Sequence, residues 1–377
     1  MQKRLHSKIA SWIINGLEKV TKGKYWTISA TIIIAITCWV YFFPKYYVAT
    51  TFLKPRYDTA SVERRVMKTQ IKKPFTALPD YGAAHPGKMQ FRLTVPAIGY
   101  LFHLNYRQLL YLQYILGVLF FWVLILLAIR CTSDKVAAVL AALGFAFTYV
   151  GINFFTDSVP YYDGFAFFFL ACAMMYRSPV LVFSFVTLCC WTDERALIAS
   201  ALVIVWWQTI TSEGDFSVRR FFQFARPSLA VVCAWGVYFI TRYLLMSHYG
   251  LRMSTQDLFS LEEWNKHPMQ TVAGIFAGLR FFWVVVVLGF AWLVQHKKYF
   301  LALVLFAISS ALVLSSAMVK DHLRSIAYLY PIIIIFLYVL GQYPEKKSSI
   351  RHVLLAVALL CFAMTPLEYF FGLDAYN

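Results

Sequence analysis

The sequence predicts an all-α, polytopic membrane protein with about eleven transmembrane helices. The chain of 377 residues is 60% hydrophobic and only 14% charged, whereas a soluble domain typically carries about 25% charged residues. Several uninterrupted apolar runs approach or exceed the roughly 18 residues that indicate a membrane-spanning helix. Such continuous runs exclude a β-barrel, because barrel strands alternate apolar and polar side chains.

The strongly basic balance of the chain indicates a membrane surface as the partner. The net charge is +17, and the basic side chains gather at the ends of the apolar runs. Lys and Arg at those positions set the orientation of spans and attract anionic headgroups. We therefore expect anionic membrane lipids as partners. No nucleic acid is expected, since no DNA- or RNA-binding module is visible.

The chain begins with a predicted interfacial helix, residues 1–24, ahead of a single membrane domain, residues 25–377. Apolar side chains recur at helical spacing on one face of residues 3–20, at Leu5, Ile9, Trp12, Ile13 and Leu17. Lysines occupy the other face, as in helices that lie on an anionic surface. Twenty-four residues precede the first apolar run and no small-residue cleavage site follows that run, so no cleavable signal peptide is expected. The charge of the segment predicts a cytoplasmic N-terminus.

The predicted membrane spans follow from the apolar runs and their flanking charges. They are Tyr25–Phe43, Leu109–Ile129, Val136–Phe155, Asp157–Tyr176, Val180–Thr192, Ala196–Ile210, Pro227–Leu245, Gly278–Val294, Tyr299–Val319, Ser325–Leu340 and Val353–Phe371. Residues 44–108 then form a large first extracytoplasmic loop. Within it, residues 60–72 predict a basic amphipathic helix and residues 91–104 a short, Pro-interrupted apolar helix, both lying along the membrane surface.

Three consecutive charges, Asp193, Glu194 and Arg195, interrupt the apolar run 180–210. One helix over this run would be about 46 Å long at 1.5 Å per residue, against a hydrocarbon core of about 30 Å. One steeply tilted span and two short helices both remain open. Two short helices are favoured, because they place the charges in an outward-facing turn and keep the later basic loops cytoplasmic.

With this topology the unusual polar residues gather on the extracytoplasmic side. The candidate phosphate-binding residues are Arg92, Arg195, Lys320, His322 and Arg324, and the supporting acidic residues are Asp157, Asp163, Asp193, Glu194 and Asp321. Guanidinium groups bind phosphate well, and basic groups beside a helix start suit an anion. The alternative interpretation is ordinary caps, turns and snorkelling side chains. Carboxylate pairs such as Asp193 and Asp321 allow a divalent cation, Mg²⁺ or Mn²⁺, although no spacing demands one.

Two short motifs resemble elements of the GT-C class of integral-membrane glycosyltransferases, over roughly residues 25–340. Arg92-Leu93-Thr94-Val95-Pro96 is similar to an Arg-x-x-x-Pro element before the second span, and Asp193-Glu194-Arg195-Ala196-Leu197 is similar to an element in a short mid-chain helix pair. Asp321-His322-Leu323-Arg324-Ser325 before a late span is a third likeness.

The resemblance implies a GT-C-like fold in the bacterial inner membrane. It implies transfer of a sugar from a polyprenyl-phosphate lipid, with an acidic residue of the first outer loop as general base. Asp58 best matches that position, and Asp80 is the alternative. Independently, transfer from a lipid phosphate needs a base for the acceptor's proton and cations for the leaving phosphate. Two other functions stay open: a polysaccharide polymerase or ligase, and a transporter or flippase of an anionic lipid or solute.

Overall fold

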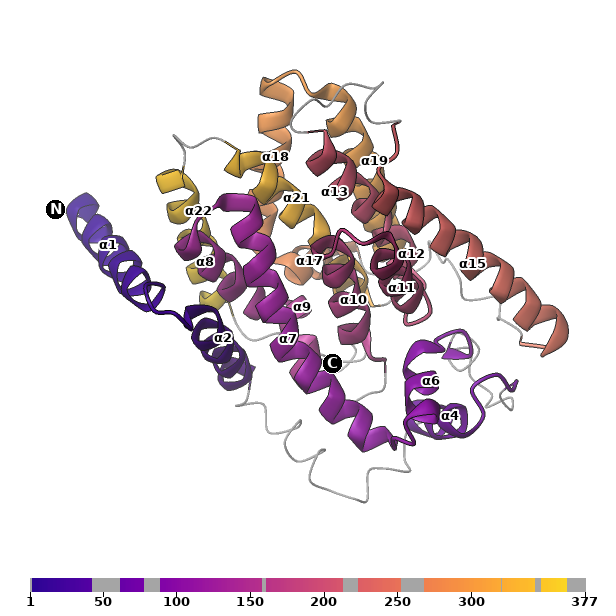
Figure 1. Ribbon diagram of the computed structural model, residues 1–377. Helices are drawn as coiled ribbons and strands as arrows, with labels where there is room; N and C mark the ends of the chain where they lie inside the picture. Colours follow the sequence, from indigo (N-terminus) through magenta and orange to yellow (C-terminus); the bar gives the residue numbers. More distant parts are fainter. Residues whose placement is uncertain are drawn as a thin grey trace.

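The computed structural model describes residues 2–42, 62–77, 89–157, 161–212, 223–251, 268–319, 321–342 and 347–364. Over these residues the chain is helical and contains no strand (Figure 1). The predicted all-α class is therefore confirmed for the described part of the chain. Three candidate site residues, Asp58, Asp80 and Lys320, lie outside the described residues.

The described helices are of very different lengths. Their bounds are α1 Gln2–Val20, α2 Trp26–Phe42, α4 Val62–Lys72, α6 Thr94–Leu101, α7 Tyr106–Thr132, α8 Lys135–Ala146, α9 Tyr149–Thr156, α10 Asp163–Met175, α11 Pro179–Cys190, α12 Arg195–Ala199, α13 Ala201–Thr211, α15 Arg226–His248, α17 Pro268–Leu279, α18 Phe282–Gln295, α19 Tyr299–Ala317, α20 His322–Ala327, α21 Tyr330–Gly341 and α22 Lys347–Ala363.

Four segments within the described residues are long and apolar enough to cross a membrane: α7, α15, α19, and α20 with α21. Two bent pairs raise this number to six if each pair counts as one span. The pair α8 and α9 bends by 59°, and the pair α17 and α18 by 83°. The protein is thus helical with four to six candidate spans. Eleven spans stay a prediction, because several of the expected spans are helices of 10–17 residues.

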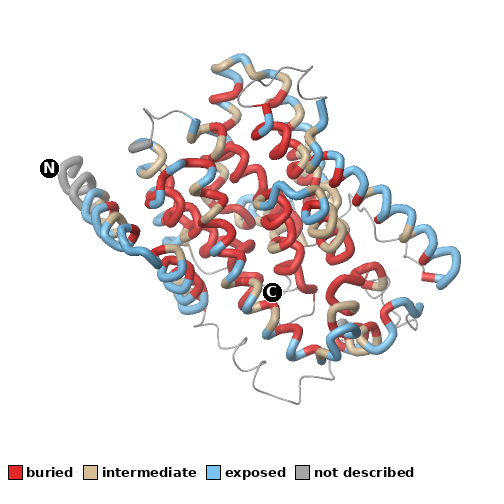
Figure 2. Tube along the Cα trace, in the orientation of Figure 1, coloured by how far each residue is buried: buried red, intermediate tan, exposed pale blue. Residues whose placement is uncertain are grey.

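Burial separates the inner helices from the outer ones. The segment formed by α20 and α21 is mostly buried, whereas only a minority of the residues of α15 and α19 are buried. Figure 2 shows the same division, with buried residues concentrated around α7, α8, α10 and α21, and exposed residues along α1 and α15. A helix that is hydrophobic all round belongs in the interior, so α21 is surrounded by protein and α15 faces the surroundings.

Hydrogen bonds define the two ends of the bundle. The Tyr162 hydroxyl donates to the Tyr106 carbonyl at 3.4 Å, so α7 and α10 begin at the same end. At the other end Arg130 donates to the Met175 carbonyl at 2.8 Å. The basic residue Arg351 joins that second end through an ion pair with Asp134, the residue before α8, at 2.5 Å. Arg351 also pairs with Glu18 of α1 at 2.6 Å. Which end faces the cytoplasm stays a prediction from the Lys and Arg distribution.

The run 180–210 forms two helical segments that reverse direction, as the length argument favoured. Helix α11 ends at Cys190, and α12 begins at Arg195 after the turn that contains the three charges. Helix α13 then returns toward the end of α10, because the indole nitrogens of Trp206 and Trp207 donate to the carbonyls of Met174 and Ala173. The charges therefore lie at the tip of a helical hairpin.

The expected first-loop helices are present as α4 and α6, and they pack against each other (Figure 1). One detail of the prediction was wrong, since Pro96 does not interrupt α6. It lies in the first turn of the helix, where a backbone N–H has no intrahelical acceptor, so the missing donor costs little. Arg92 lies two residues before the start of α6.

Helix α17 contacts α20 through two glycines, Gly274 and Gly278. A Cβ on Gly278 would lie 2.2 Å from the Ile326 side chain and 2.9 Å from the Leu323 carbonyl, and one on Gly274 would lie 2.8 Å from the Cβ of His322. Small residues four apart let membrane helices approach closely. The motif is visible in the sequence as Gly-Ile-Phe-Ala-Gly, but the sequence does not show which helix it contacts.

We expect Gly278→Ala to lower the free energy of unfolding by about 1–3 kcal/mol, because the new methyl group forces α17 away from α20. The matched control is Gly236→Ala on the outer helix α15, where a Cβ would meet no atom within 4 Å. This control should be neutral or slightly stabilising. Unfolding of both variants in detergent micelles by increasing SDS measures the difference. Equal stability of the two variants would contradict the close contact.

Candidate functional site

A buried group of charged side chains lies where the hairpin tip meets α6, α10 and α20. We call it the arginine cluster, and it consists of Arg92, Asp163, Asp193, Arg195 and Arg324. The exposed fractions of these side chains are 8%, 0%, 0%, 13% and 1%. Charges buried to this degree are stable only when they are paired and hydrogen-bonded, so the pairing of each member determines its role.

Asp163 is the counter-ion of Arg324. The carboxylate accepts from Nε of Arg324 and, at 2.9 Å, from its Nη2. The Tyr328 hydroxyl donates to the same carboxylate at 2.9 Å, and Arg195 Nη2 lies 3.6 Å away. Asp163 is also in the first turn of α10, where the helix dipole stabilises a negative charge. Asp163 is therefore a structural counter-ion of the buried arginines.

Asp193 is bound by all three arginines. Its oxygens accept from Nε and Nη2 of Arg195 at 2.7 Å each, and lie 3.0 Å from Arg92 Nη2 and 3.2 Å from Arg324 Nη2. Burial alone would raise the pKa of Asp193, but the guanidinium groups, led by Arg195, outweigh burial and hold that pKa below its usual range. Asp193 therefore acts as a counter-ion and not as a proton acceptor.

Arg92 is the arginine of the cluster with spare donors. Its Nη2 contacts Asp193 at 3.0 Å and Glu194 at 3.6 Å. Its Nε and Nη1 are buried and meet no hydrogen-bond partner among the described residues. Buried donors without acceptors are rare in folded proteins, and they indicate a bound water, ion or ligand group. Arg195, by contrast, uses its third nitrogen to donate to the Ser325 hydroxyl at 2.8 Å.

Two tyrosines complete the cluster, and the sequence analysis did not single them out. The Arg324 guanidinium carbon lies 4.0 Å from the ring centroid of Tyr161, and the Arg195 guanidinium carbon lies 5.2 Å from that of Tyr328. Such cation–π contacts stabilise buried arginines. The available signal was the position of Tyr161 two residues before Asp163.

Glu194 and Asp321 form a half-exposed acidic rim beside the buried cluster. Glu194 has 35% of its side chain exposed and lies 3.6 Å from Arg92, and Asp321 has 31% exposed and lies 3.6 Å from Arg324 Nη1. Both contacts are longer than a direct hydrogen bond. The rim carboxylates therefore remain accessible to solvent, in contrast to Asp163 and Asp193.

Two predicted site residues make polar contacts outside the cluster. His322 lies 3.1 Å from the Thr271 hydroxyl and 2.8 Å from the Ser316 carbonyl, so both ring nitrogens have polar neighbours on α17 and α19. Asp157 accepts from the Tyr162 backbone N–H at 3.0 Å and closes the turn before α10. This contact is the turn-forming alternative that the sequence also allowed for Asp157.

The described residues contain no group of three or more His, Cys, Asp or Glu side chains with metal-ligand geometry. The suggested pairing of Asp193 with Asp321 around Mg²⁺ or Mn²⁺ does not fit the donor set. The oxygens of Asp193 are occupied by guanidinium groups, and a metal ion beside three arginines would meet strong charge repulsion.

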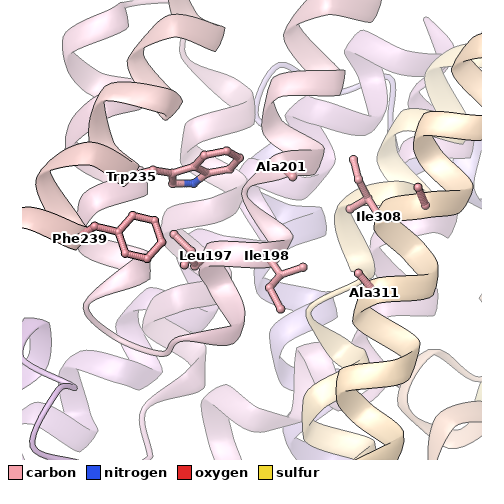
Figure 3. A pocket seen from close by; sticks show the side chains of 8 residues that line it. Leu197, Ile198, Ala201, Trp235, Phe239, Ile308 and Ala311 are labelled. Atoms are coloured by element: carbon pink, nitrogen blue, oxygen red, sulfur yellow. The ribbon is translucent and has the colours of Figure 1, made fainter. Parts of the chain in front are cut away.

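An apolar groove of about 510 Å³ lies beside the hairpin. Its lining comes from three parts of the fold, and consists of Leu197, Ile198, Ala201, Trp235, Phe239, Ala307, Ile308 and Ala311. Figure 3 shows the aromatic residues of α15 on one side, α12 and the start of α13 in the middle, and α19 on the other side. Leu197 and Ile198 belong to the short helix that begins with Arg195, so the apolar groove and the charged cluster share an element.

No family model, curated protein or solved structure matches this chain. The fold and the site define a helical membrane protein with a buried arginine cluster next to an apolar groove.

Proposed function

We propose that the protein binds an amphiphile with an anionic head and an apolar tail, and that it is a GT-C-type glycosyltransferase that uses a polyprenyl-phosphate sugar. The observation that carries the proposal is Arg92, whose two buried unpartnered donors lie in a three-arginine cluster beside an apolar groove. Arginine suits phosphate oxygens, and the groove suits a prenyl chain. The bacterial inner membrane and an extracytoplasmic site belong to the same proposal.

The proposed reaction is an inverting transfer. A hydroxyl oxygen of the acceptor attacks the anomeric carbon of the sugar while a carboxylate takes the hydroxyl proton. The bond between the anomeric carbon and the phosphate oxygen breaks, and the prenyl phosphate leaves with the electron pair. Arg92 stabilises the negative charge that develops on the phosphate, because its donors are held in place before the reaction begins. A single base is sufficient for this reaction.

The base in this proposal is Asp58, with Asp80 as the alternative. Both lie in the first loop and outside the described residues, so their assignment comes from the resemblance alone. The described carboxylates of the cluster are unsuitable as bases. Asp163 and Asp193 are fully buried and each accepts hydrogen bonds from guanidinium groups, so their oxygens are already occupied and shielded from an acceptor hydroxyl.

The test uses vesicles that contain the purified protein and a panel of prenyl-phosphate-linked, radiolabelled hexoses and pentoses, with envelope glycans as acceptors. We expect one donor to be consumed, with free prenyl phosphate released in equal amount. Movement of intact donor between the two leaflets without consumption would instead indicate the transporter or flippase function. Consumption with growth of a lipid-linked glycan by repeat units would indicate the polymerase.

A further inference from the structure

We infer that the protein binds a monovalent cation, Na⁺ or K⁺, where helix α9 ends against α7, with the side-chain oxygen of Gln113 as one ligand. The inference is independent of the proposed function, since the site lies outside the arginine cluster and uses none of its side chains. Three observations carry it: unpartnered amide oxygens in the buried interior, the position of Gln113 at the negative end of a half-helix, and the carboxylate of Asp157 at the same end.

Two buried amide oxygens meet no hydrogen-bond donor among the described residues. They are Oε1 of Gln113 and Oδ1 of Asn153, and the two residues are 0% and 2% exposed. Nε2 of Gln113 donates to the backbone carbonyls of Asn153 and Phe154 at 3.3 and 3.4 Å. A flipped Gln113 amide would point its oxygen at those two carbonyl oxygens, so the contacts define its orientation. A buried acceptor without a donor indicates a bound water or ion.

The same contacts place the Gln113 amide at the C-terminal end of α9. Helix carbonyls point toward the C-terminus, and those of Asn153 and Phe154 belong to the last turn of α9, which ends at Thr156. The last carbonyls of a helix have no intrahelical donor, and the helix dipole makes this end negative. Helix α9 is also the second half of the bent pair α8 and α9. In membrane proteins, the C-terminal ends of such half-helices can coordinate Na⁺.

A carboxylate lies at this negative end as well. Asp157 is the C-cap residue of α9, where the helix dipole opposes a negative charge, and its partial exposure gives an ion a route from solvent. Arg64 approaches the same turn, since Arg64 and Asp157 both act electrostatically on Tyr162. Arg64 can balance Asp157, but it leaves the Gln113 oxygen without a donor. One carboxylate among neutral oxygens suits a monovalent cation, whereas Ca²⁺ sites typically combine several carboxylates.

An ion at this place would brace three helices. Gln113 belongs to α7 and contacts the end of α9, and a Cβ on Gly164 in the first turn of α10 would lie 3.3 Å from its Cγ. The residue before Gly164 is Asp163, the counter-ion of Arg324. Cation binding should therefore stabilise the fold next to the arginine cluster.

The experiment measures the unfolding temperature of the purified full-length protein in detergent micelles, in NaCl, KCl and choline chloride at equal ionic strength. Choline serves as the reference cation, because its methyl groups prevent close coordination by oxygen. A ligand that binds only the folded state raises the unfolding temperature as its concentration increases. We expect a saturable rise of about 2–4 °C in Na⁺ or K⁺ relative to choline.

Gln113→Leu removes the oxygen ligand and should weaken the apparent cation affinity by at least about tenfold. The matched control is Gln208→Leu, which removes another buried amide, on α13 near the opposite end of the bundle. This control should leave the cation effect unchanged. Gln113→Glu places a second negative charge at the end of α9, so its unfolding temperature should rise more with the cation than that of the wild type. If Gln113→Leu fails to fold, the wild type and Gln113→Glu still decide the question.

Three results would overturn the inference. Equal unfolding temperatures of the wild-type protein in all three salts would mean that a buried water satisfies the Gln113 oxygen. An unchanged cation effect in folded Gln113→Leu would place the ion elsewhere. A cation effect in Gln113→Glu no larger than that of the wild type would refute a cation next to this side chain. A rise with both alkali ions would support the site and show that it does not select between them. None of these results bears on lipid binding, so the proposed function is tested separately.

Discussion

Asp163→Asn is expected to lower the free energy of unfolding by about 3–5 kcal/mol, the largest stability change among the variants proposed for this protein. The substitution keeps the shape of the side chain but removes the negative charge that binds Arg324, which has 1% of its side chain exposed. Three guanidinium groups would then face one buried carboxylate, that of Asp193. A buried charge without its partner costs far more than a surface charge does.

The matched control is Asp321→Asn, which removes a carboxylate from the same arginine. Asp321 has 31% of its side chain exposed and only a 3.6 Å contact with Arg324, so its removal should cost less than about 1 kcal/mol. Unfolding by SDS in mixed micelles gives both values. If the two variants lose equal stability, the interaction of Asp163 with Arg324 does not contribute as a buried ion pair, and the cluster is held together by packing alone.

Asp58→Asn is expected to reduce sugar transfer by about 10²–10⁴-fold, because a general base contributes rate enhancements of this size. The donor should still bind, since the arginine cluster is unchanged. The predicted pattern is therefore a fall in kcat with little change in KM for the prenyl-phosphate donor. The measurement is initial transfer rate in vesicles as a function of donor concentration.

Asp80→Asn is the comparison that assigns the base, because it removes the other first-loop candidate. If Asp58→Asn keeps full activity and Asp80→Asn loses sugar transfer, Asp80 is the general base. Wild-type rates in both variants would refute a first-loop base. Glu194, a half-exposed carboxylate 3.6 Å from Arg92, would then be the first residue to substitute.

The helical hairpin shows how far the sequence could predict this fold. The length of the apolar run 180–210 and its three central charges were sufficient to predict two short helices, because a single helix would exceed the membrane thickness. The length of an apolar run was a less reliable guide to the shape of the span over residues 136–155. Helices α8 and α9, predicted as one straight span, bend by 59°, and such a bend depends on neighbouring helices.

The residues of the site were easier to predict than their roles. Arg92, Arg195 and Arg324 stood out because charges next to apolar runs are unusual, and the structure brings these three together around Asp193. The sequence could not predict which of these arginines pair with buried carboxylates and which keep donors for a ligand. That division depends on which N–H donors lie near acceptors in the folded protein. Gly274 and Gly278 were visible in the sequence, but only the tertiary structure shows that they let α17 pack closely against α20.

The sequence by itself determined that this is a helical, basic membrane protein with polar residues concentrated in a few short segments. Composition and the length of apolar runs determine that class, because hydrocarbon admits few charges and satisfies no backbone hydrogen bonds. Only the tertiary structure decided that Asp163 and Arg324, 161 residues apart, form a buried pair and that Arg92 keeps two spare donors. Those facts depend on how α6, α10, α12 and α20 pack, which no local pattern in the chain encodes.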